Sequence, residues 1–412
     1  MRCTGPTDKV LHAEIESSPR SQVPVPTWRD PVRRLAIQGA AALCLLSCAP
    51  GLPGQLTAAE RESWVGDAPT VAPPLAIDLR PKLTKKDVSR AIRKVADWQL
   101  AKAQEGFNLD WTFAVLYAGF MAIPDAVNGE KYRDAMLQMG RKFNWQLGPR
   151  FQVADDHVVG QTYLDLYLRY HDPAVIAPTR ERMDALMQLP DNPDKPLWWW
   201  CDGLFMGPAV FAKLYETTGD RKYLDYMDHE WRITSALLYS PQDQLFYRDK
   251  SYFNKHEANG ASVFWSRGNG WAFAGLARVL ATMPADYPTR PQYIDQFRAM
   301  AEKLALLQGA DGLWRSGLLN ESAYPLPENS GSSFFTLGFA YGVRSGILDR
   351  RKYLPVVRKA WKGLLSHVYE DGRLGCIQPV AAEPGEFAPT SSYVYGVGAF
   401  LLAGAEIYEL GR

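Results

Sequence analysis

Helical periodicity dominates the pattern of apolar and polar positions beyond residue 84. Behind the capping sequence Thr84-Lys85-Lys86-Asp87, the apolar residues Val88, Ile92 and Val95 recur at helical spacing. Further patterns of roughly 12 to 20 residues follow, broken by glycine, proline and aspartate clusters, and strand-like alternation is scarce. The sequence therefore predicts an all-α domain over residues 84–412.

A loose repeat marks the turns between these helices. Four stretches place a tyrosine early in a helix after a polar turn, namely Tyr132, Tyr223, Tyr293 and Tyr353, and "HDPAVIAPTRERMDAL" is a weaker copy without it. Successive turns lie roughly 45 to 70 residues apart, which leaves room for about six helical hairpins. Six hairpins closed into a ring form an (α/α)6 barrel, in which loops at one end converge on a candidate site.

The N-terminal region has the pattern of a targeting segment. Arg33 and Arg34 precede an apolar run that ends in Leu45-Leu46-Ser47-Cys48, a sequence similar to a bacterial lipobox, and the paired arginines also fit twin-arginine export. We predict a signal region over residues 1–48, with a true start codon nearer Arg33, and a Pro/Gly/Ala-rich linker over residues 49–83. The expected location is the bacterial periplasm, or a membrane to which a lipid on Cys48 anchors the chain.

Composition narrows the function classes. The chain has 46 basic and 45 acidic residues, so we expect no broad positive electrostatic field that would attract nucleic acid. Its 13 tryptophans and 20 tyrosines suit the flat faces of sugar rings as well as a core. No nucleotide-binding or metal-spaced motif occurs, so we expect no metal and no cofactor. Cys201 and Cys376 are the cysteines beyond the signal region, and one disulfide between them is possible.

The run "WWWCDGLFMGP" sets Asp202 against a dense group of aromatic residues. One interpretation is a helix N-cap, because an apolar helical run follows at once. The other is a general acid, because burial beside Trp199 and Trp200 raises a carboxyl pKa toward neutrality. Both roles are compatible.

A second acidic cluster contains Asp155, Asp156 and His157. The cluster has the composition of a solvated, helix-capping turn. Paired carboxylates from separate hairpins are also what acid/base chemistry on a glycoside uses. Asp156 is our candidate partner for Asp202.

Other motifs combine aromatic, glycine and polar residues at helix starts. In "WSRGNGW", Arg267 fits either a buried structural ion pair or a fork onto a sugar carboxylate, with Trp265 and Trp271 stacking on sugar faces. Ser330 and Ser332 in "PENSGSS" fit a helix-start loop or a polar subsite. Trp111 fits core packing or a subsite wall.

At these motifs the sequence resembles the unsaturated rhamnogalacturonyl hydrolases of glycoside hydrolase family 105, which are related to the unsaturated glucuronyl hydrolases of family 88. The likeness spans about residues 85–412 and rests on the order of "DDHVVGQTYLDLY", "WWWCDGLFMGP", "WSRGNGWAFAGLARVL", "DGLWRS", "PENSGSSFFTLGFAYGVRSGIL" and "TSSYVYGVGAFLLAGAEIY". It implies an (α/α)6 barrel and a metal-free exo-acting enzyme. Its expected substrate is an oligosaccharide with an unsaturated uronic acid at the non-reducing end, such as unsaturated galacturonyl-rhamnose from pectin.

The resemblance also implies roles for individual residues. Asp202 matches the family's proton donor and Asp156 an assisting aspartate, while Trp265, Arg267 and Trp271 match a substrate-contacting run. Further substrate contacts are expected from the residues His157, Trp199, Trp200, Ser330, Ser332 and Trp111.

Three other functions compete with this interpretation. A conventional inverting glycosidase on the same fold uses the same carboxylates, and a glycan-binding lipoprotein needs no catalysis. A sugar epimerase requires paired histidines, whereas the six histidines of this chain are scattered.

Overall fold

The computed structural model describes residues 64–190, 192 and 195–411 of the chain. The predicted signal region, Cys48 and residues 49–63 of the predicted linker lie outside the described residues. The described part is mostly helical, and none of its helices has the length and apolar character needed to cross a membrane.

Six helices of the described residues form a closed inner ring. Each contacts the next in chain order, and the last contacts the first. In order around the ring they are α3 (Trp111–Ala122), α6 (Val159–Tyr170), α9 (Pro208–Thr218), α11 (Ser266–Thr282), α13 (Asn329–Ser345) and α15 (Val394–Leu410).

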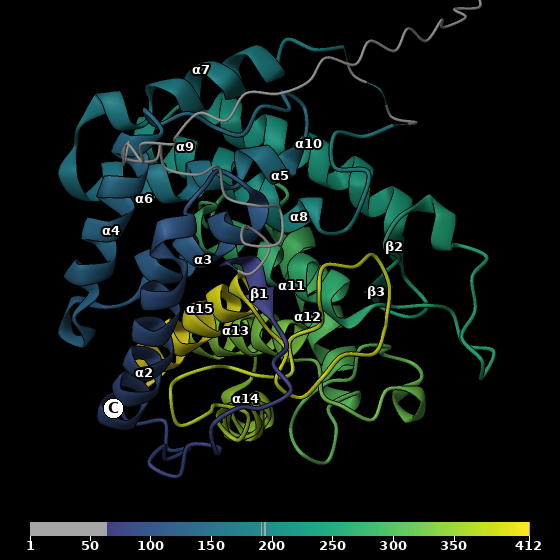
Figure 1. Ribbon diagram of the computed structural model, residues 1–412. Helices are drawn as coiled ribbons and strands as arrows, with labels where there is room; N and C mark the ends of the chain where they lie inside the picture. The colour runs from purple at the N-terminus through teal and green to yellow at the C-terminus, as the bar shows by residue number, and fades with distance from the viewer. Residues whose placement is uncertain (1–63, 191, 193–194, 412) are drawn as a thin grey trace, which may run out of the picture. The chain divides into compact units, whose positions relative to one another are not determined.

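A second set of six described helices lies outside this ring. Figure 1 shows one of them, α14, beside the adjacent inner pair α13 and α15, which run together through the middle of the view. The alternation of inner and outer helices confirms the predicted (α/α)6 barrel. The outer helices are α2 (Lys85–Ala103), α4 (Gly129–Lys142), α7 (Ala177–Leu186), α10 (Arg221–Leu238), α12 (Arg290–Leu306) and α14 (Arg350–Leu365).

Short elements connect the helices at their ends. Two single-turn helices, α5 (Ala154–His157) and α8 (Gly203–Met206), contact each other. Two antiparallel pairs join β1 (Gly66–Asp67) to β4 (Ser392–Tyr393) and β2 (Tyr239–Ser240) to β3 (Leu245–Phe246). The 3-10 turns are η1 (Gln104–Gly106), η2 (Asp125–Val127), η3 (Pro173–Val175), η4 (Lys250–Tyr252) and η5 (Glu321–Ala323).

Contacts with the helical domain extend into the end of the predicted linker. Besides the pairing of β1 with β4, the Asp67 carboxylate forms ion pairs with Lys102 of α2 and with Arg373. Trp64 lies against Gly106, where a Cβ atom would come within 2.5 Å of the indole. Residues 64–83 therefore belong to the packed part of the chain.

The inner helices approach closely where glycines face one another. A Cβ atom at Gly398 of α15 would lie 2.3 Å from the Val115 carbonyl oxygen of α3, and one at Gly119 would lie 2.7 Å from the Gly398 carbonyl oxygen. Only glycine permits this separation of the two backbones. The ring is therefore narrow enough for side chains to fill its centre.

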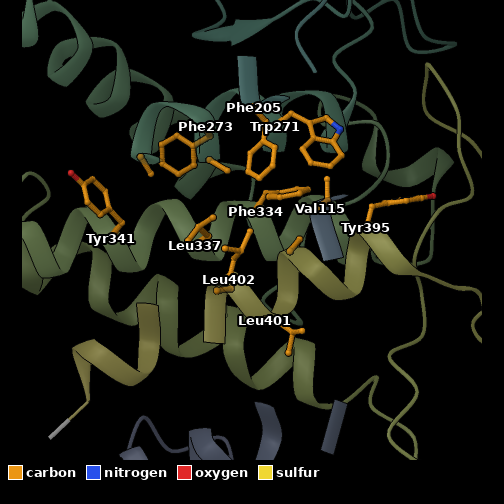
Figure 2. Packing of buried hydrophobic residues seen from close by; sticks show 14 of the residues in the cluster. Val115, Phe205, Trp271, Phe273, Phe334, Leu337, Tyr341, Tyr395, Leu401 and Leu402 are labelled. Carbon is orange, nitrogen blue, oxygen red and sulfur yellow. The ribbon is translucent and has the colours of Figure 1, made fainter. Parts of the chain in front are cut away.

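Aromatic side chains fill that centre. Figure 2 shows Phe205, Trp271 and Phe334 gathered above α13 and α15. Their ring centroids are 5.0 Å apart for Phe205 and Trp271, and 4.2 Å apart for Trp271 and Phe334. The middle of the barrel is a packed core, so ligand chemistry is confined to its ends.

Candidate active site

The segment Trp198–Met206 is held rigidly at one end of the barrel. Trp198 is fully buried, and its carbonyl oxygen accepts a hydrogen bond from the Thr234 hydroxyl at 3.0 Å. The backbone N–H of Cys201 donates to the Arg248 carbonyl oxygen at 2.9 Å. Asp202 is thereby fixed at the start of α8.

The Asp202 carboxyl sits at the N-cap position of α8 without making a side-chain capping hydrogen bond. Burial raises its pKa, and the positive charges of Arg248 and Arg267 oppose that rise without cancelling it. The Cys201 thiol lies 3.4 Å from Asp202 Oδ2 and donates to it. Asp202 therefore keeps its proton at a higher pH than an ordinary aspartate, as a general acid requires.

A second carboxyl near Asp202 is that of Asp155, on the neighbouring helix α5. Burial first, and the charge of Asp202 second, raise the pKa of Asp155 to about 7. Two carboxyls with raised pKa values, on two helices that contact each other, form the centre of the candidate site.

Asp156, which the sequence favoured over Asp155, is engaged elsewhere. Its Oδ2 accepts from the backbone N–H of Arg150 at 2.5 Å, and its Oδ1 accepts from Arg150 Nη2 at 2.6 Å. The Gly148 N–H donates to the Asp156 carbonyl oxygen at 2.9 Å, so Asp156 ties residues 148–150 to α5. An assisting catalytic role for Asp156 stays a prediction.

His157 is buried and neutral. Burial lowers its pKa to about 4, and its Nε2 lies 2.7 Å from the Phe151 carbonyl oxygen. Since this nitrogen donates to a carbonyl, the ring also holds the 148–151 loop. A direct substrate contact by His157 stays a prediction.

The "WSRGNGW" residues lie beneath the site in the core. Arg267, 1% exposed, donates from Nη1 to the Gln378 carbonyl oxygen at 2.7 Å and from Nη2 to the Pro379 carbonyl oxygen at 2.8 Å. Trp265 donates from Nε1 to Gln378 Oε1 at 2.8 Å, and Trp271 is fully buried among aromatic rings. Arg267 and Trp265 anchor the loop after residue 376, whereas Trp271 packs against Phe205 and Phe334. Substrate contacts by these three side chains stay predictions.

Ser330 and Ser332 are also buried in hydrogen bonds of the fold. The Ser330 hydroxyl donates to Glu328 Oε1 at 2.6 Å, and the Ser332 hydroxyl accepts from the Trp314 N–H at 3.0 Å. Glu328 additionally accepts from the N–H groups of Ser330 and Gly331, as an N-cap of α13. These contacts agree with the interpretation of this stretch as a helix-start loop, and a substrate contact by either serine stays a prediction.

Tryptophans nearer the surface differ in how they are placed. Trp199 is 43% exposed, whereas Trp200 is buried, and their ring centroids lie 4.9 Å apart. Both line a cavity of about 510 Å³ together with Val153, the residue before α5. Trp111 is partly buried and packs on Tyr395 and Trp271. The exposed face of Trp199 is a surface on which a sugar ring can stack.

Arg248 is a candidate site residue that sequence reasoning missed. Its side chain is 23% exposed, its guanidinium lies 5.6 Å from the Trp199 ring centroid, and its charge lowers the pKa of Asp202. The sequence feature that could have identified it is the charged pair Arg248-Asp249 after the apolar residues Leu245 and Phe246. No local sequence pattern indicated that this pair lies near residues 199–202 in the fold.

The described cysteines are both free and buried, so the possible disulfide between Cys201 and Cys376 is not formed. Within the described ranges, no group of three or more His, Cys, Asp and Glu side chains is placed to hold a metal ion.

Comparison with known proteins identifies the family. Residues 83–410 match the profile of Glycosyl Hydrolase Family 88. The chain is 36% identical over 349 residues to an unsaturated 3S-rhamnoglycuronyl hydrolase of Formosa agariphila, covering 80% of this chain and 92% of the relative. A protein of the same name from an Alteromonas species is 32% identical over 371 residues, with 81% and 89% covered.

A solved structure agrees with the sequence relatives. A family 88 glycosyl hydrolase from Bacteroides vulgatus superposes with a TM-score of 0.75 at 32% identity, covering 79% of this chain and 99% of that protein. The motif resemblance and the predicted enzyme class are confirmed. The chain belongs to glycosyl hydrolase family 88 and is a glycoside hydrolase.

Proposed function

We propose that this hydrolase releases an unsaturated uronic acid from the non-reducing end of an oligosaccharide by adding water across its C4=C5 double bond. The observation that carries the proposal is the Asp202 carboxyl, whose pKa is raised by burial and which makes no capping hydrogen bond. An enol ether is protonated on carbon, and this needs an acid that still holds its proton near neutral pH.

The chemistry follows from the substrate. Asp202 gives its proton to C4, which leaves an oxocarbenium ion shared by C5 and the ring oxygen. Water bonds to C5 and loses a proton to the Asp202 carboxylate or to Asp155. The resulting C5 hemiketal opens to a ketone by breaking the bond between C5 and the ring oxygen, and the hemiacetal at C1 then expels the second sugar.

Asp155 is the better-placed assisting group. The Asp156 carboxylate is held by Arg150, whereas Asp155 interacts with Asp202 and titrates near neutral pH. A carboxyl that exchanges its proton at about pH 7 can relay protons between water and Asp202.

The proposed substrate is an unsaturated uronic acid linked to rhamnose. Elimination removes the configuration at C4, so glucuronyl and galacturonyl precursors leave the same unsaturated ring and differ only in their anomeric bond. The names of the two relatives contain rhamnoglycuronyl, which supports rhamnose as the neighbouring sugar. The cavity beside Trp199 and Trp200 is where we place that sugar.

The test uses unsaturated disaccharides made by polysaccharide lyases and follows the ultraviolet absorbance of the conjugated enol ether. The wild type should remove the absorbance, and Asp202→Asn should lose at least about 10³-fold in kcat/KM while remaining folded. Asp134→Asn, an exposed aspartate on α4, is the matched control and should be fully active. Full activity of Asp202→Asn, or activity on saturated glycosides alone, would contradict the proposal.

A further inference from the structure

The proposed substrate carries an anionic group, the C6 carboxylate, directly beside the reacting double bond. A buried or partly buried carboxylate needs a cationic hydrogen-bonding partner. The sequence assigned this task to Arg267, but both terminal nitrogens of Arg267 donate to backbone carbonyl oxygens, of Gln378 and Pro379. Its guanidinium is also enclosed by Trp265 and Tyr395, at 4.5 and 4.9 Å from their ring centroids.

Arg150, the arginine on the α5 side, is also committed. Its Nη2 and Nε donate to Asp156 at 2.6 and 3.1 Å, and its Nη2 lies 3.8 Å from Asp155. A substrate carboxylate there would have to compete with a buried carboxylate of the protein. That exchange is costly, because it leaves Asp156 without its partner.

We propose that Arg248 binds the C6 carboxylate of the substrate and so places C4 at Asp202. This inference rests on the proposed function. The Arg248 carbonyl oxygen accepts from the Cys201 N–H, which sets the arginine next to the proton donor along a fixed backbone. Its side chain reaches the partly exposed face of Trp199.

The Arg248 guanidinium is oriented by Asp249, and the arginine side chain stays partly exposed. Nη1 donates to Asp249 Oδ2 at 2.5 Å, and Asp249 is itself fixed by the Ser251 N–H at 2.8 Å. Nε is buried and has no hydrogen-bond partner among the described residues. The Nε of Arg267 is buried and unpaired in the same way, so this atom does not distinguish the two arginines. What distinguishes them is access, because the Arg248 side chain is 23% exposed and Arg267 is 1% exposed, and we therefore place the substrate carboxylate at the exposed part of Arg248.

Substrate binding at Arg248 would also act on the proton donor. The positive charge of Arg248 lowers the pKa of Asp202, in opposition to burial. A carboxylate bound to the guanidinium offsets that charge, so Asp202 holds its proton more firmly once the substrate is in place. Binding and protonation are therefore coupled through a single arginine.

The experiment compares an unsaturated disaccharide with its neutral C6 methyl ester, using the full chain and both Arg248→Met and Arg248→Gln. The wild type should prefer the acid, and both variants should lose that preference by roughly tenfold to a hundredfold, mainly through KM. Arg344→Met removes an arginine paired with Glu406 and should keep the wild-type ratio.

The outcomes separate the two proposals. An unchanged preference for the acid in both folded variants would overturn the role of Arg248 while leaving the proposed function intact. A wild type that consumes neither compound would refute the proposed function itself. If Arg248→Met does not fold, Arg248→Gln, which keeps a polar hydrogen-bonding group at the end of the side chain, carries the same comparison.

Discussion

Asp202 and Asp249 both lie near the Arg248 guanidinium, yet their pKa values are shifted in opposite directions. Asp249 accepts from Ser251 and from Arg248, and these hydrogen bonds lower its pKa despite burial. Asp202 has the weakly donating Cys201 thiol beside it, so burial dominates and raises its pKa. The hydrogen bonds that each carboxyl receives decide which one can act as an acid.

Cys201 offers a direct way to vary that balance. Burial and the nearby Asp202 charge raise the pKa of the Cys201 thiol well above its usual range, so it stays protonated and donates. We predict that Cys201→Ala raises the pKa of Asp202 and moves the alkaline limb of the kcat/KM profile to higher pH. Cys201→Ser, a stronger donor, should move it to lower pH. The measurement is the pH profile of both variants, and shifts in the same direction would contradict the role of the thiol.

Asp155 links the site to stability. Its folded-state pKa of about 7 lies above the ordinary 3.8, so the folded chain holds a proton that the unfolded chain releases between these values. Stability is therefore lost as pH rises through that window. We predict that Asp155→Asn is more stable than the wild type by about 1 to 4 kcal/mol at pH 8, with little difference at pH 4. Denaturant unfolding at both pH values checks this, and equal stability at pH 8 would refute the raised pKa.

The choice between Asp155 and Asp156 shows where sequence reasoning stopped at this scale. The sequence predicted that an acidic pair lies near Asp202, and the contact between α5 and α8 agrees with this prediction. Both acids, however, lie in the same turn of helix. What separates them is Arg150, whose backbone and side chain both bind Asp156. Such a tertiary contact has no local signature, and the same holds for the carbonyl oxygens that bind Arg267.

Among the elements, three of the four repeated tyrosines have a shared structural role. Tyr223 of α10 donates to Asp184 of α7 at 2.8 Å, and Tyr293 of α12 donates to Asp228 of α10 at 3.2 Å. Tyr132 of α4 likewise donates at 2.8 Å to an aspartate of α2, Asp97. In each case the tyrosine joins one outer helix to the outer helix before it.

These links should contribute unequally to stability. Asp228 is 8% exposed, whereas Asp184 is 37% exposed, so water replaces the lost donor more readily at Asp184. We predict that Tyr293→Phe lowers the free energy of unfolding by about 1 to 2 kcal/mol and that Tyr223→Phe costs less than about 1 kcal/mol. Thermal unfolding of the pair checks the order, and a larger cost for Tyr223→Phe would contradict it.

Element prediction succeeded because its signals are local. The Thr84 hydroxyl caps α2 by accepting from the Asp87 N–H at 3.2 Å, as the capping sequence predicted. The turn repeat identified α4, α10, α12 and α14 by their tyrosines, and its weak copy identified α7. The pairing of β1 with β4 was not foreseen, because it joins residues more than three hundred positions apart through two-residue strands.

At the scale of the whole molecule, we propose that the chain is exported and attached to a membrane by a lipid on Cys48. The sequence Leu45-Leu46-Ser47-Cys48 after Arg33 and Arg34 supports this proposal. In a bacterial host, the wild type should incorporate labelled fatty acid and fractionate with membranes, and Cys48→Ser should abolish both. Equal labelling of the two proteins would refute lipid attachment at this residue.

The central claim, hydration of the double bond rather than displacement at the anomeric carbon, is tested most directly with a sulfur-linked unsaturated disaccharide. Sulfur is a poor site for the protonation that conventional glycosidases rely on, whereas protonation of C4 does not involve it. The account predicts that the wild type removes the enol ether absorbance of this compound at a rate comparable to that of the oxygen-linked substrate, and that Asp202→Asn does not. An absorbance that persists with the sulfur-linked compound, while the oxygen-linked one is cleaved, would contradict it.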